Sequence, residues 1–170
     1  MYRVIFSHGK DSSPNSTKIG LLRILAEELG FQNHAIDYTT CQDVNARLAL
    51  LQGVLETYPN DRIILVGSSM GGYVSLAAAN LFVIDSLFLM CPALYMDGYD
   101  VQSFLPLTNN IEIIHGWHDE VVPAINSIRF AQSVSASLHL VSDNHRLTES
   151  LELVGERFTR FLEQLRSKKH

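Results

Sequence analysis

Short apolar runs alternate along the chain with longer segments in which apolar residues recur every three or four positions. The short runs have the length of β-strands, and the longer segments have the period of amphipathic helices. The predicted strands are residues 2–7, 34–38, 62–66, 85–90, 111–115 and 138–141. The predicted helices are residues 17–29, 43–58, 70–81, 124–134 and 148–165.

This alternation of strands and helices predicts the α/β fold class. Right-handed crossovers between parallel strands leave few topologies, and we expect a doubly wound, mostly parallel six-stranded sheet. The expected strand order is 2-1-3-4-5-6, with helices on both faces. Ligands bind at the carboxyl ends of the strands in such sheets, so any site is expected in the loops that follow them. Residues 91–110 show little periodicity and are expected to form a short lid over an open site.

The length of 170 residues predicts a single domain, residues 1–170, with a core large enough to need no disulfide. The two cysteines, Cys41 and Cys91, lack metal-type spacing, and we expect two buried thiols in a reducing cytoplasm. The net charge of −5 and the absence of a long basic run argue against nucleic acid or an anionic membrane as partner. No apolar run approaches the roughly 18 residues of a membrane span, and the first residues do not resemble a signal peptide.

Residues 67–72 read Gly-Ser-Ser-Met-Gly-Gly and lie between a predicted strand and a predicted helix. This G-x-S-x-G pattern places Ser69 on a tight, strained turn that exposes its hydroxyl, as a nucleophile requires. Side chains at Gly67 and Gly71 would collide with the turn, whereas Ser68 is expected to be structural. The alternative is a glycine-rich turn that only packs closely.

A serine hydroxyl needs a histidine base and a carboxylate that orients the base, and the expected chain order is Ser, Asp, His. Asp119 follows the fifth predicted strand and His145 follows the sixth, so both lie at the same sheet edge as Ser69. We predict Asp119 as the acid and His145 as the base, with Glu120 and Asp143 as alternative acids. His115 and His118 also lie near Asp119, but no second cluster completes a ligand set, and no metal or other cofactor is expected.

An oxyanion hole needs two N–H donors. The amide of Met70, directly after the candidate nucleophile, is the first candidate. The second is the amide of Lys10, in the loop at residues 7–14 that follows the first strand. Alternatively this loop only leads into the next helix, which Ser16 or Thr17 is expected to cap.

Two of these motifs resemble a known family. Residues 8–18 (HGKDSSPNSTK) are similar to the HGxxSSPxSxK opening of the small bacterial YqiA-like esterases, which are α/β hydrolases. Residues 66–73 (VGSSMGGY) resemble the nucleophile segment of that family, and residues 119–121 and 144–145 resemble its acid and base segments.

The resemblance implies a reduced α/β-hydrolase fold with a minimal lid. It also implies a cytoplasmic, cofactor-free esterase for short acyl esters, with weak thioesterase activity and Ser69, Asp119 and His145 as its triad. Two features depart from the family: Lys10 stands where an apolar residue is usual, and residues 91–110 form a shorter segment. Substrate preference therefore transfers less well than the catalytic residues.

Other functions remain open at this stage. A thioesterase or amidase would use the same residues on a different small-molecule substrate. A non-catalytic α/β-hydrolase-like binding protein usually lacks a triad residue, and none is missing here. A flavodoxin-like nucleotide or flavin binder shares the strand order but leaves Ser69 and His145 without a role.

Overall fold

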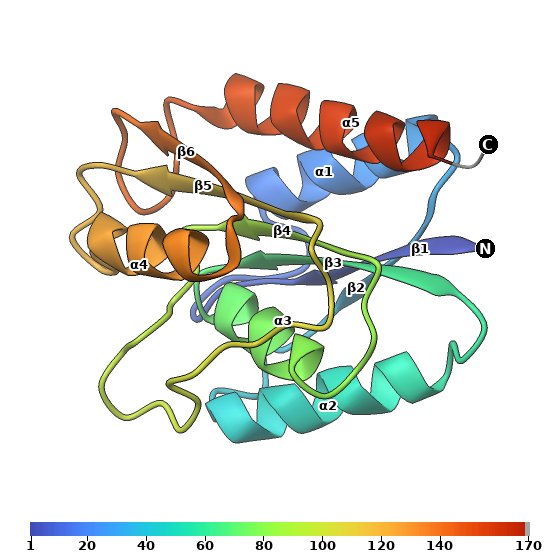
Figure 1. Ribbon diagram of the computed structural model, residues 1–170, viewed down its shortest axis with the longest axis horizontal. Helices are drawn as coiled ribbons and strands as arrows, with labels where there is room; N and C mark the ends of the chain where they lie inside the picture. The colour runs from blue at the N-terminus through green and yellow to red at the C-terminus, as the bar shows by residue number, and fades with distance from the viewer. Residues whose placement is uncertain (169–170) are drawn as a thin grey trace.

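The computed structural model describes residues 1–168 as a parallel sheet between two layers of helices (Figure 1). The strands are β1 (Tyr2–Ser7), β2 (Gln32–Ile36), β3 (Arg62–Ser68), β4 (Ser86–Met90), β5 (Ile111–Gly116) and β6 (Ser137–Val141). The helices are α1 (Thr17–Glu28), α2 (Val44–Glu56), α3 (Met70–Ala79), α4 (Ala124–Val134) and α5 (Leu151–Ser167). All five strand pairings are parallel, and the strand order is β2-β1-β3-β4-β5-β6, which confirms the predicted topology.

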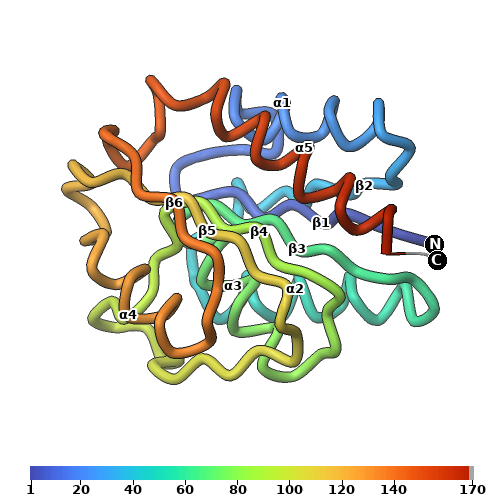
Figure 2. The backbone as a smooth tube through the Cα atoms, turned by 45° about the horizontal axis from the view of Figure 1, so that its top comes forward, coloured from blue at the N-terminus to red at the C-terminus, as the bar shows by residue number. Residues whose placement is uncertain are grey.

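Helices α1 and α5 cover one face of the sheet, while α2, α3 and α4 cover the other (Figure 1). Helices α1 and α5 lie side by side, as the second view also shows (Figure 2). Because successive side chains of a strand point to opposite faces, each central strand supplies both cores. In β3, Leu65 belongs to the core under α2, α3 and α4, whereas Ile64 and Val66 belong to the core under α1 and α5.

Two predicted elements begin at least two residues away from the expected position. The strand expected at residues 34–38 is β2, two residues earlier, because β1 ends at Ser7, which pairs with Ile36 and leaves the following residues without a strand neighbour. Helix α5 begins at Leu151 rather than at Thr148. The chain before it makes a turn in which Leu147 has a φ of 55° and accepts a hydrogen bond from the Ser150 amide.

The cysteine prediction was half right. Both thiols are free, and Cys91 is buried, but Cys41 is only half-buried because it lies in the loop that leads into α2. At the start of α1, the Ser16 hydroxyl accepts a hydrogen bond from the Ile19 amide at 3.4 Å, as the capping prediction required. Within residues 1–168, no helix is long and apolar enough to cross a membrane.

The segment 91–110 contains no helix or strand. It packs on the helices beside it: the Tyr99 ring contacts Tyr73 of α3 in a tilted arrangement, and Phe104 contacts Phe130 of α4 edge to face. Asn126 of α4 donates a hydrogen bond to the carbonyl of Leu94 in this segment, at 2.8 Å. The segment is therefore fixed to the helical layer.

Candidate active site

Ser69 stands alone between the end of β3 and the start of α3. Its backbone has φ 53° and ψ −118°, a conformation that is strained for any residue with a side chain. Its amide donates to the Met90 carbonyl at 3.0 Å, and its own carbonyl accepts from the amides of Gly72 and Tyr73. These bonds hold the strained turn from both sides, so the hydroxyl sits at the N-terminus of α3.

The glycines around Ser69 leave no room for a side chain. A Cβ atom at Gly67 would lie 2.5 Å from the Gly71 carbonyl oxygen, and one at Gly71 would lie 1.9 Å from the Ser7 carbonyl oxygen. A Cβ atom at Gly72 would lie 2.7 Å from the Pro92 ring. The predicted collision is confirmed, and the glycines allow α3 to pack directly on the ends of β1 and β3.

Replacing Gly71 with alanine is therefore expected to lower the free energy of unfolding by about 3 kcal/mol, the upper end of overpacking penalties. The contacting atoms are backbone and cannot move away cheaply. Gly53, inside α2, provides the matched control, because a Cβ atom there would have nothing within 4 Å. Gly53→Ala is expected to raise the free energy of unfolding by about 0.5–1 kcal/mol. Urea denaturation followed by circular dichroism measures both, and equal effects of the two substitutions would contradict the packing interpretation.

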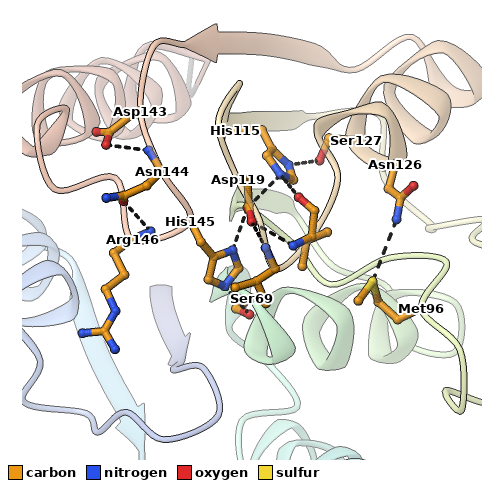
Figure 3. Close-up of polar contacts among 12 residues, drawn as sticks. Ser69, Met96, His115, Asp119, Asn126, Ser127, Asp143, Asn144, His145 and Arg146 are labelled. Atoms are coloured by element: carbon orange, nitrogen blue, oxygen red, sulfur yellow. Dashed lines mark hydrogen bonds and ion pairs between the residues drawn. The ribbon is translucent and has the colours of Figure 1, made fainter.

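The structure brings Ser69, His145 and Asp119 together from three loops at the carboxyl ends of β3, β6 and β5 (Figure 3). The His145 Nε2 atom lies 2.8 Å from the Ser69 hydroxyl oxygen. On the other side of the ring, His145 Nδ1 lies 2.6 Å from Asp119 Oδ2. The imidazole thus connects the hydroxyl to the carboxylate, in the arrangement that general-base activation of a serine requires.

The Asp119 side chain is fully buried and is held at both oxygens. Oδ1 accepts hydrogen bonds from the amides of Val121 and Val122, each at 2.8 Å, while Oδ2 faces His145 and His115. Burial by itself would raise the pKa of this carboxyl. The hydrogen bonds from His115, His145 and the two amides outweigh that effect and hold the pKa well below its ordinary range. Asp119 is therefore ionised at any pH at which the protein would work.

The loops after β5 and β6 are bound to each other. The Trp117 amide donates to the Val141 carbonyl at 2.8 Å, and the His118 amide donates to the Asp143 carbonyl at 3.0 Å. Gly116 makes this approach possible, because a Cβ atom there would lie 2.4 Å from the Asp143 carbonyl oxygen. The positions of Asp119 and His145 are thereby fixed relative to each other.

The other two candidate acids lie outside the hydrogen-bonded chain. Asp143 uses its carboxylate to accept from the amides of Asn144 and Glu149, at 2.7 and 2.9 Å, and so shapes the loop that carries His145. Glu120 is exposed. Trp117, in the loop after β5 that also carries Glu120, has an exposed side chain and is not part of the core.

The loop after β1 passes next to Ser69. A Cβ atom added at Gly9 would lie 3.4 Å from the Ser69 Cβ, so the space between this loop and the candidate nucleophile is no wider than one methyl group. Met70 is the first residue of α3, where amides have no partner within the helix. The predicted donors, Met70 and Lys10, are thus on the two segments that flank Ser69, and their donation to an oxyanion stays a prediction.

Two residues that the sequence did not single out hold this loop. The Tyr38 amide donates to His8 Nε2 at 2.9 Å, and the buried Arg47 guanidinium donates to the His8 carbonyl at 3.0 Å. A signal for Arg47 was present, since it falls on the apolar face of its helix beside Val44 and Leu51. A charged residue on an apolar face indicates a specific buried partner.

Of the residues that the structure describes, Cys91, His115 and Asp119 form a group with ligand atoms within 4.8 Å of one another. His118, considered with them from the sequence, turns instead to the Ser142 hydroxyl at 3.3 Å. Burial raises the pKa of the Cys91 thiol to about 12, so the thiol is protonated at neutral pH. A metal ion bound here would have to displace that proton and would compete with His145 for Asp119.

Comparisons with known proteins agree with this fold. The model of a family described as "Uncharacterised protein family (UPF0227)" matches residues 3–101. An α/β-superfamily hydrolase structure from Xanthomonas campestris is 31% identical, with 96% of this chain and 99% of that chain covered and a TM-score of 0.88. Est1E from Butyrivibrio proteoclasticus is 20% identical, with 96% and 87% covered and a TM-score of 0.82. Mouse alpha/beta hydrolase domain-containing protein 10 is 19% identical, with 96% and 90% covered and a TM-score of 0.80. No curated protein sequence matches the chain.

The family model covers more than half of the chain, and the Xanthomonas structure aligns over nearly all of it. Both agree with the resemblance that the motifs around His8 and Ser69 indicated. The chain belongs to the UPF0227 family and, with it, to the α/β-hydrolase superfamily.

Proposed function

We propose that the protein is a serine hydrolase that cleaves carboxylic esters through an acyl-enzyme. The proposal rests above all on the continuous chain of hydrogen bonds from Ser69 through His145 to Asp119, built on a strained turn. Such a chain serves to remove a proton from a serine hydroxyl, and it has no evident purpose in a protein that only binds a ligand.

In the first half of the reaction, the Ser69 oxygen attacks the ester carbonyl carbon while His145 Nε2 accepts the hydroxyl proton. The negative charge that develops on the carbonyl oxygen is stabilised by the amides of Met70 and Lys10. Asp119 stabilises the resulting imidazolium and keeps its ring in place. The tetrahedral intermediate then collapses, and the alcohol leaves with the proton from His145.

The second half repeats these steps with water. His145 Nε2 removes a proton from a water molecule, whose oxygen attacks the acyl carbon on Ser69. Collapse of this second tetrahedral intermediate returns the proton to the Ser69 oxygen and releases the carboxylic acid. No step of this mechanism needs a cofactor. We also propose that the protein acts in the cytoplasm.

Short acyl chains fit the open setting of Ser69 and His145. The His145 side chain keeps 19% of its surface exposed, and the segment 91–110 is anchored on α3 and α4 without forming a helical lid. Two surface hollows lie elsewhere, one between α1 and α5 and one between α4 and β6, and no triad residue lines either. A site that opens to solvent gives long chains little additional burial.

Labelling with a fluorescent fluorophosphonate tests the proposal. We expect the wild-type protein to be labelled, with peptide mass spectrometry placing the adduct on Ser69. Ser69→Ala and His145→Ala are expected to lose the label, since one lacks the nucleophile and the other lacks its base. Folded wild-type protein that takes up no label would instead favour the non-catalytic binding protein.

Substrate class is tested by comparing p-nitrophenyl esters of increasing acyl length with a thioester and an anilide of the same acyl group. We expect kcat/KM to be highest for the short esters. A clear preference for the thioester or the anilide, with labelling still on Ser69, would retain the serine mechanism and replace the ester assignment by thioesterase or amidase.

A further inference from the structure

The proposed reaction gives no role to His115, the fully buried histidine near the end of β5. Its Nε2 atom lies 3.0 Å from Asp119 Oδ2 and 2.9 Å from the Val122 carbonyl oxygen. Its Nδ1 atom lies 2.7 Å from the Ser127 hydroxyl oxygen on α4. Both ring nitrogens are therefore occupied, and the side chain points from the strand directly at the carboxylate (Figure 3).

The partners of His115 determine where its hydrogen is. A carboxylate oxygen and a carbonyl oxygen can only accept, so Nε2 must carry a hydrogen, which faces both. Ser127 can either donate or accept, and its hydroxyl satisfies Nδ1 in either protonation state. The ring is thus fixed with an N–H directed at the space between Asp119 and Val122.

Two imidazoles consequently meet at one oxygen atom. His145 Nδ1 lies 2.6 Å from Asp119 Oδ2, and His115 Nε2 lies 3.0 Å from the same atom. The two rings differ in freedom, because His145 is partly exposed and must exchange protons, whereas His115 is sealed in the core. The amides of Val121 and Val122 donate to Oδ1, and His115 donates to Oδ2. The carboxylate therefore keeps a fixed donor on each oxygen while His145 gains and loses a proton during the reaction.

We propose that His115 is a positioning residue of this site, which holds Asp119 Oδ2 in the orientation that His145 requires by means of an N–H at Nε2. The inference rests on the proposed function, since it assigns a role within the same triad. His115 does not touch the substrate, and it acts only through Asp119.

The effect of His115 has to be distinguished from those of the other charged and titratable groups that face the carboxylate. These are His145 from the loop after β6, the Cys91 thiol after β4 and the Lys18 ammonium from α1. Lys18 also lies 3.5 Å from the Arg146 carbonyl, in the loop of His145. None of them is changed by substituting His115, so a change in pH dependence can be ascribed to the lost hydrogen bond.

His115→Phe and His115→Gln form the decisive pair of variants. Phenylalanine keeps a ring in the cavity and removes the N–H, whereas the glutamine amide can place an N–H near the position of Nε2. We expect His115→Phe to lower kcat for a short ester by about 10- to 100-fold, the effect of losing one hydrogen bond to a charged group. KM should change by less than about twofold, because the substrate is not contacted, and His115→Gln should recover most of kcat.

The pH profile gives a readout that a merely structural role would not move. Removing a hydrogen bond to the ionised carboxyl raises the pKa of Asp119, so the carboxylate becomes protonated at a higher pH than in the wild type. In His115→Phe the acid limb of kcat/KM should therefore shift to higher pH. Because partial unfolding also depends on pH, the folded fraction of each variant is measured by circular dichroism at every pH of the profile.

His139→Phe is the matched control, since His139 Nε2 lies 3.1 Å from Glu112 Oε1 near the other end of β5. It removes an imidazole–carboxylate pair outside the site and should leave the pH profile unchanged. Wild-type kcat in folded His115→Phe, or equal losses in His115→Phe and His115→Gln with an unshifted acid limb, would overturn the inference. Full activity of Ser69→Ala would instead overturn the proposed function, so the two failures are distinguishable.

A measurement on the unaltered protein covers the case in which His115→Phe does not fold. Nitrogen-15 NMR of histidine-labelled wild-type protein reports which ring nitrogens carry hydrogen. We expect a hydrogen on His115 Nε2 at every pH at which the protein stays folded. A His115 ring with hydrogen on Nδ1 only would overturn the inference, because it could not donate to Asp119.

Discussion

Ser69→Ala is expected to lower kcat for a short ester by about 10⁶-fold, the scale measured when the nucleophile of a serine hydrolase is removed. The reason is that, among residues 1–168, no other hydroxyl forms a hydrogen bond with the His145 ring. Some rate above the uncatalysed reaction should survive, because the proposed amide donors and the bound geometry do not depend on the hydroxyl. Stopped assays at high enzyme concentration, with each variant expressed and purified in parallel, measure the loss.

Ser68→Ala is the natural comparison for that variant. Ser68 is the adjacent serine, buried at the end of β3, whereas the ring nitrogens of His145 bond Ser69 and Asp119. Its replacement should leave kcat within about threefold of the wild type, the range of a modest packing change. Losses of similar size in both variants would mean that damage to the turn, rather than removal of a nucleophile, explains the result.

Asp119→Asn is expected to lower kcat by about 10⁴-fold at neutral pH. Asparagine has the same shape, but its amide can donate to His145 Nδ1 and so favours the ring form with hydrogen on Nε2. That hydrogen faces Ser69 and leaves no lone pair to accept the hydroxyl proton. The fold should persist, because the side-chain oxygen of asparagine can still accept from the amides of Val121 and Val122.

Glu120→Gln provides the comparison for the acid. Glu120 is the next residue in the chain, it is exposed, and the sequence alone left it as an alternative to Asp119. Kinetics of the two variants at several pH values decide between them. Unchanged activity in Asp119→Asn together with a large loss in Glu120→Gln would reverse the assignment.

The sheet order could be predicted from the sequence because alternating strands and helices with right-handed crossovers allow little else. The bounds of the elements were less well predicted where a residue is buried by particular side-chain contacts and not by its place in a strand. Tyr38 looked like the end of a strand, yet it is buried because its hydroxyl lies 2.9 Å from that of Ser7 and its ring lies under Arg47. Such contacts join residues far apart in sequence and leave no periodic trace.

In the site, too, features that depend on a local sequence pattern could be predicted, whereas features that depend on contacts between distant residues could not. Ser69 could be identified because a strained turn requires glycines at fixed spacing, and this requirement is local. The contact of His115 with Asp119 could not be identified, since a histidine at a strand end is equally compatible with a metal ligand or a core residue. Only the fold of the loop 117–123 around the end of β5 brings its ring to the carboxylate.

All ten residues of α3 are buried, from Met70 beside the nucleophile to Ala79. The helix that begins directly after Ser69 is thus also part of the protein interior along its whole length, and hardly any substitution along it would be neutral. Homologues that evolve activity on a new substrate can therefore tolerate few substitutions in α3. Their adaptive changes are expected in surface segments, where Leu105 and Val121 are exposed and can be exchanged without disturbing the interior.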